Sequence, residues 1–176
     1  MASPSSRRLV LSDRGRPVEF SFADLLRYHG PGSPGGVAHA FAVLDRALPL
    51  LSPGGPPERR RITVRTAFGG PGARDGFELV TRAVTEGRYV VDPALARPER
   101  GVAMERFVFE LTLGDARVTT AVRDGFVTEE FIALARRDPR SDAEESELDR
   151  LKLEMCRRVM GAPAEAVYDV DRPEDR

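Results

Sequence analysis

The most constraining feature of this sequence is a pair of alternating segments between Phe107 and Val122. A period of two places every second side chain on one face of a strand, and a short glycine-containing turn pairs two such strands antiparallel. The pattern therefore predicts a hairpin with one buried face, which other elements must cover. The alternating positions flank a turn at residues 114–115 and are Phe107, Phe109, Leu111, Leu113, Val118, Thr120 and Val122.

Helical patterns on both sides of this hairpin can supply the cover. Serine or threonine begins several of them, and an acidic residue three positions later twice completes a capping box. Helices toward the two ends of the chain and antiparallel strands between them indicate an α+β fold, with helices on one face of a mostly antiparallel sheet. The expected helices are residues 22–29, 34–48, 73–85, 129–137 and 142–160, and the further strands are residues 18–20, 61–68 and 88–92.

The length of the chain, 176 residues, suits one domain. We place this domain at residues 17–170. The Ser- and Arg-containing start, residues 1–16, is expected to be a flexible segment, and residues 171–176 are expected to form a polar tail.

Composition and charge exclude several classes of binding partner. The 27 basic and 28 acidic side chains leave a net charge of −1, without the positive excess of a nucleic-acid-binding protein. Asp45 and Arg46 interrupt the apolar run at residues 40–51, so this run does not span a membrane. Cys156 is the only cysteine, which excludes an internal disulfide. We therefore expect a cytoplasmic protein that binds neither nucleic acid nor membrane.

The stretch from His29 to Gly36 is the first candidate site. It is rich in glycine, it opens a helix at Pro34, and both histidines of the chain, His29 and His39, fall within or just after it. Backbone N–H groups at a helix N-terminus favour an anion such as a carboxylate or a phosphate. Three glycines that let a ligand approach the backbone are the expected contacts: Gly32, Gly35 and Gly36.

Ser33 and the two histidines of this stretch also have purely structural explanations. Ser33 can serve only as the N-cap of the helix that begins at Pro34. His39 can be a partly buried structural residue on the helix flank. His29 can simply interact with the dipole at the end of the preceding helix.

A second glycine-rich stretch, residues 69–76, leads into the expected helix at residues 73–85. It carries Asp75 as a candidate site residue, with Arg74 or Arg82 as counter-charges for an anionic ligand. We hypothesise that the two turns converge on one pocket. Ser33, His29 and Asp75 would then be candidate catalytic residues, although the chain lacks the Gly-x-Ser-x-Gly elbow that serine nucleophiles often use.

These motifs resemble those of the formylmethanofuran dehydrogenase E-subunit-like family. Its first motif reads His-Gly-His-x-Cys-Pro-Gly and opens a helix, and residues 29–35 here read His-Gly-Pro-Gly-Ser-Pro-Gly. Its second motif places a cysteine three residues before an aspartate at a helix start, positions held here by Gly72 and Asp75. Residues 163–168 are similar to the segment that closes the family domain, so the resemblance extends over about residues 17–170.

The resemblance implies a metal, often zinc, near the first motif. In this chain Ser33 replaces the motif cysteine and Pro31 replaces the second histidine, and serine is a poor zinc ligand. Zinc or another divalent metal would therefore need a site rebuilt from His29, His39 and Asp75, whose nitrogen and oxygen donors suit such ions.

Three functions remain open at this point. The first is a small-molecule-binding protein or enzyme that holds an anionic ligand on a glycine-rich helix N-terminus, with His29 as acid/base and Ser33 as ligand contact or nucleophile. The second is a metal-binding accessory protein, as the resemblance suggests. The third is a non-catalytic subunit or a structural homodimer.

Overall fold

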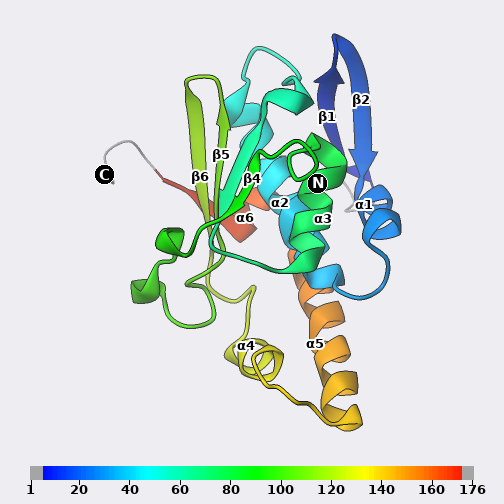
Figure 1. Ribbon diagram of the computed structural model, residues 1–176, viewed down its shortest axis with the longest axis vertical. Coiled ribbons are helices and arrows are strands. Elements are labelled where there is room, and N and C mark those ends of the chain that lie inside the picture. The colour runs from blue at the N-terminus through cyan, green and yellow to red at the C-terminus, as the bar shows by residue number, and fades with distance from the viewer. Residues whose placement is uncertain (1–5, 172–176) are drawn as a thin grey trace.

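The computed structural model describes residues 6–171 and has an α+β fold (Figure 1). Its main sheet has the strand order β4-β3-β5-β6-β7, in which β3 and β4 are parallel and the other neighbours are antiparallel. The strands are β3 (Thr63–Thr66), β4 (Tyr89–Val91), β5 (Val108–Leu113), β6 (Ala116–Val122) and β7 (Tyr168–Val170).

The expected hairpin at the centre of the sheet is confirmed. Strands β5 and β6 pair antiparallel, with Phe109 opposite Thr120 and Leu111 opposite Val118. These four side chains are buried, because the face that carries them packs toward the helices. The turn contains Gly114 at a φ of 58°, a left-handed conformation that glycine adopts without a steric penalty.

Helix α2 (Pro34–Leu51) lies at the centre of the molecule. It packs against the main sheet, against helix α3 (Pro71–Thr81) and against helix α5 (Asp142–Met160). All residues from Gly35 to Leu44 are buried, so this helix is covered around its whole circumference. The expected end at residue 48 is wrong by one turn, because the helix continues through Pro49 to Leu51.

Helices α2 and α3 run side by side in the same direction and approach closely at glycines. A Cβ atom added to Gly72 would overlap the carbonyl oxygen of Ser33 and lie 3.0 Å from the backbone nitrogen of Val37. One turn further on, a Cβ atom at Gly76 would lie 2.7 Å from the Cβ atom of Ala40. The glycines on α3 therefore set the spacing between the two helices.

The remaining helices begin where the sequence predicts. Ser21 and Asp24 form a capping box at helix α1 (Phe22–His29), and Ser141 and Glu144 form another at α5. Thr128 accepts a hydrogen bond from the backbone of Phe131 at helix α4 (Glu129–Ala135). Helix α6 (Ala164–Val167) precedes β7. The expected helix at residues 73–85 is shifted, since α3 starts at Pro71 and ends at Thr81, followed by the C-cap residue Arg82 with a left-handed backbone.

The prediction that residues 1–16 are flexible is wrong for the part that the structure describes. Strands β1 (Arg8–Asp13) and β2 (Arg16–Ser21) form an antiparallel hairpin on the side of α2 opposite the main sheet (Figure 1). Leu9 and Leu11 are 2% and 0% exposed, because this short alternating pair packs into the hydrophobic core. Residues 1–5 lie outside the described part of the chain.

Most of the expected tail, residues 172–176, also lies outside the described residues. Asp171, its first residue, is held in place: its backbone N–H donates to the carbonyl of Thr119, and its carboxylate accepts from Arg97. Within residues 6–171, no helix combines the length and the apolar character that crossing a bilayer requires.

The contact between α2 and α3 gives a first testable prediction. Gly72→Ala should destabilise the protein by ~1–3 kcal/mol, the usual cost of overpacking, although alanine is intrinsically the better helix former. The free energy of unfolding from urea denaturation measures this change. Gly32→Ala is the matched control, because a Cβ atom there meets no atom of the described residues within 4 Å. Equal stability of the two variants would contradict a close helix contact.

Candidate functional site

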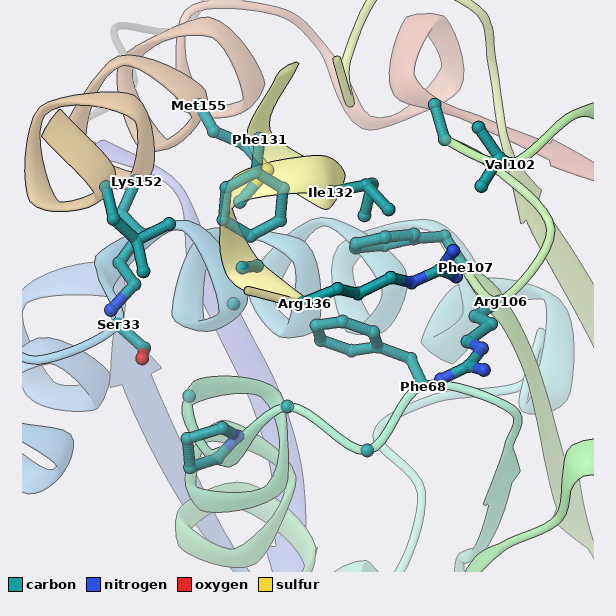
Figure 2. A pocket seen from close by; sticks show the side chains of 18 of the residues that line it. Ser33, Phe68, Val102, Arg106, Phe107, Phe131, Ile132, Arg136, Lys152 and Met155 are labelled. Atoms are coloured by element: carbon teal, nitrogen blue, oxygen red, sulfur yellow. The ribbon is translucent and has the colours of Figure 1, made fainter. Parts of the chain in front are cut away.

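A cavity with a volume of about 470 Å³ lies where α2 and α3 begin (Figure 2). Helices α4 and α5 and the loop before β5 form its other walls. Its lining residues are Ser33, Gly36, Phe68, Gly69, Gly70, Pro71, Gly72, Val102, Ala103, Arg106, Phe107, Phe131, Ile132, Ala135, Arg136, Arg140, Leu148, Lys152 and Met155. The structure thus brings the two glycine-rich turns of the sequence to one cavity.

Both helices that start at this cavity lack a side-chain cap. Ser33 is the N-cap residue of α2, as expected, but its side chain makes no capping hydrogen bond. Gly70 occupies the N-cap position of α3 and has no side chain to cap with. By contrast, side chains cap α1, α4 and α5. Neither α2 nor α3 has an acidic residue in its first turn. No side chain of these turns therefore neutralises the positive ends of the two helix dipoles, and these ends favour a bound anion.

The charged side chains at the cavity are all cationic. Among the described residues that line it, four carry a positive charge and none is acidic: Arg106, Arg136, Arg140 and Lys152. Arg136 pairs with Glu105 at 3.0 Å, and Arg140 pairs with Glu145 at 2.8 Å. Lys152 donates to the carbonyl oxygen of Gly32 at 3.1 Å.

Arg106 differs from the other three cations. No other residue within 6–171 forms a hydrogen bond or an ion pair with its side chain. Its guanidinium group therefore keeps all its donors available for a ligand.

Aromatic side chains form the apolar part of the wall. The rings of Phe68 and Phe107 are stacked, with centroids 4.3 Å apart and planes inclined by 27°. Phe131 projects from α4 toward the same space (Figure 2). The cavity therefore joins an apolar surface to cationic groups, and such a mixture suits a small organic anion.

His29 and Asp75 come together across 46 positions of sequence. His29 Nδ1 lies 2.8 Å from Asp75 Oδ2, and this hydrogen bond ties the end of α1 to α3. The His29 side chain is only 8% exposed and does not line the cavity. Its Nε2 atom is buried and has no hydrogen-bond partner among residues 6–171, so the Ser33 hydroxyl does not hydrogen-bond to it. The expected Ser33, His29 and Asp75 triad is therefore not assembled.

His39 lies in the hydrophobic core, away from the other candidate metal ligands. Its Nδ1 is 2.7 Å from the hydroxyl oxygen of Tyr168, and its ring packs against Phe107 at a centroid distance of 4.8 Å. Complete burial lowers the pKa of His39 to about 3, because the charged form would lose its hydration. His39 is therefore a neutral structural residue, the alternative that the sequence left open.

The expected metal site is not formed by these residues. No three His, Cys, Asp or Glu side chains between residues 6 and 171 lie close enough to hold a metal ion, which corrects the grouping of His29, His39 and Asp75. Ser33 and Gly72, which take the positions of the motif cysteines, do adjoin each other. Neither supplies a thiolate, so the residues present do not fit the zinc that the resemblance implies.

The expected ligand contacts are only partly placed at the cavity. Gly36 lines it, whereas Gly35 packs against Met155 and Lys152 of α5, and Gly32 contributes its carbonyl to Lys152. Arg74 faces Asp75 at 3.7 Å, outside the wall. Arg82 pairs with Glu78 at the opposite end of α3, so it cannot neutralise a ligand at the first turn.

Sequence reasoning missed the four cations of the cavity. Lys152 is the one with a usable signal: it is the only lysine of the chain, and it shares a helix face with Leu148 and Met155 at spacings of four and three residues. A charge on an otherwise apolar stripe indicates a polar function for that face. The three arginines come from a loop and from the end of α4, where no periodicity shows which way a side chain points.

Comparisons with known proteins add no identity to this site. No protein-family model matches the chain, and no curated protein matches its sequence. The resemblance to the formylmethanofuran dehydrogenase E-subunit-like family therefore stays a prediction from the motifs.

The burial of His39 gives a pH-dependent prediction. Its pKa is about 3 in the folded protein and near 6.5 when the chain is unfolded. Only the unfolded state gains this proton as the pH falls from 6.5 toward 3, so stability should drop across that window by up to ~1.4 kcal/mol per pH unit from this group. Urea unfolding at a series of pH values measures the slope.

Two variants isolate the contribution of His39. His39→Gln should flatten the slope between pH 6.5 and 4, because glutamine does not titrate. Tyr168→Phe removes the hydrogen-bond partner but keeps the buried imidazole, so it should retain the slope. An unchanged slope in His39→Gln would show that His39 is not the neutral buried group described here.

The His29–Asp75 hydrogen bond gives a separate prediction. A double-mutant cycle with His29→Ala and Asp75→Ala should show a coupling free energy of ~1–2 kcal/mol, since a hydrogen bond to a carboxylate contributes in that range. The free energy of unfolding of the four proteins provides the measurement. Arg74→Ala is the control, because the exposed Arg74–Asp75 pair should couple weakly. Additive effects of the two alanines would refute the pairing.

Proposed function

We propose that this protein binds a small organic anion in the cavity at the start of α2 and α3. The observation that carries the proposal is the charge of the cavity wall: four cationic side chains, no acidic residue among the described lining positions, and two helix N-termini without side-chain caps. Each of these features favours negative charge in the same space.

The apolar lining supports an organic anion rather than a bare inorganic one. Phe68, Phe107 and Phe131 form much of the wall, and a hydrated inorganic ion gains nothing from contact with their rings. The volume of about 470 Å³ lies within the range of small-molecule sites. A ligand with an apolar body and a carboxylate or phosphate group matches both parts of the surface.

We propose binding alone, without a reaction step. His29 is the residue that the sequence favours as an acid/base group, yet it lies outside the cavity wall with its free ring nitrogen buried. A metal-binding role is not proposed, since the donors are not brought together. A homodimer is likewise not proposed.

Thermal unfolding with matched probes tests the proposal. Benzoate and phenyl phosphate should raise the Tm by several degrees at concentrations well above their Kd, because a ligand that binds only the folded state stabilises it. Benzamide and benzylamine have the same ring without the negative charge and should have little effect. Equal shifts with all four probes, or no shift with any of them, would refute the proposed anion site.

A variant links this binding to the cavity. Arg106→Ala should weaken binding of benzoate or phenyl phosphate about tenfold or more, because a hydrogen bond between charged groups is lost. Arg117→Ala is the matched control, since Arg117 is half-exposed and is not among the cavity-lining residues. Isothermal titration calorimetry measures both values of Kd.

A further inference from the structure

We infer that the ligand of this cavity carries a negative charge at each of two ends, with a planar apolar part between them. This inference rests on the proposed function and names the ligand class of the same site. Figure 2 shows Lys152 and Ser33 on one side of the cavity and the guanidinium groups of Arg106 and Arg136 on the other. The aromatic side chains occupy the space between these two groups.

The Lys152 end suits a compact oxyanion. The ammonium group lies 3.1 Å from the carbonyl oxygen of Gly32, just before the N-terminus of α2. Its one acidic neighbour among the described residues, Asp149, is 3.8 Å away and its side chain is 74% exposed, so this ion pair is weak. An ammonium group and free helical N–H groups in one place can bind a carboxylate or phosphate oxygen together.

The arginine end suits a second anion. Within the described residues, the Arg106 side chain has no hydrogen-bond or ion-pair partner, and Arg136 forms an ion pair with Glu105 alone. A guanidinium group can bind a carboxylate or phosphate through two parallel hydrogen bonds. Arg140 is not counted here, because Glu145 and the carbonyl groups of Ala135 and Arg137 already occupy it.

The middle of the cavity suits a flat group. Phe68 and Phe107 form a stacked pair, and an aromatic ring placed against such a pair gains contact over its whole face. Because these rings separate the two cationic ends, a single carboxylate can satisfy only one of them. A ligand with both charges therefore uses the whole wall, whereas a monoanion leaves one cationic end facing water.

Calorimetry with aromatic diacids of increasing length tests the inference. The probes are terephthalate, 4-carboxyphenylacetate and biphenyl-4,4′-dicarboxylate, each compared with the same molecule lacking one carboxylate. At least one diacid should bind about tenfold or more tightly than its monoacid. This advantage should disappear in Arg106→Ala and in Lys152→Met, because in each variant the diacid and the monoacid can use only the one cationic end that remains. Circular dichroism checks that both variants are folded.

The possible outcomes separate the two proposals. If monoacids bind as tightly as diacids at every length, the two-ended ligand is wrong, although the proposed anion site stands. If neither monoacids nor diacids bind, the proposed function itself fails. If the diacid keeps its advantage in both variants, these two cations are not the ends of the site.

Chemical labelling of Lys152 gives an independent readout. Because it is the only lysine of the sequence, acylation by a dilute N-hydroxysuccinimide ester modifies one side chain, and peptide mass spectrometry separates it from the N-terminal α-amino group. A saturating diacid should slow the acylation of Lys152 several-fold and leave that of the α-amino group unchanged. Tight diacid binding without protection of Lys152 would exclude this residue as one end of the site.

Discussion

The contact between α2 and α3 is the constraint on which the rest of this structure depends. Gly72 has no side chain, so the backbone of α3 rests directly on Ser33 and Val37 at the start of α2. This contact fixes where both helices begin, and both begin at the cavity. Helix α2 in turn occupies the centre of the molecule, against the main sheet on one side and the β1–β2 hairpin on the other.

Local sequence signals were enough to predict most of the secondary structure. The alternation on both sides of Gly114 and the capping boxes at Ser21 and Ser141 are short-range patterns, and the structure has the elements that they predict. The errors occur where tertiary contacts override composition. The segment around Leu9 and Leu11 is polar on average, yet its two leucines meet a buried surface that the local sequence does not reveal.

The candidate site was harder to predict because it is assembled from distant segments. The glycine-rich turns could be found, since glycine density before a helix is a local signal. The role of each titratable residue could not, because burial decides it: His39 faces Tyr168 in the core, 129 positions away, and His29 faces Asp75. The four cationic side chains belong to α5, the end of α4 and loops, so only the folded chain shows that they line one cavity.

The parallel course of α2 and α3 has an energetic consequence for the unliganded protein. Each helix N-terminus carries about half a positive charge, and two such ends in contact repel by ~1 kcal/mol at an effective dielectric constant of about 20. The hydrophobic packing of the two helices holds these like poles together. An anion between them would remove the repulsion, so some of its binding free energy would come from relief inside the protein rather than from new contacts. The charge of the ligand therefore decides whether this repulsion is relieved: an anion removes it, whereas a neutral ligand leaves it in place.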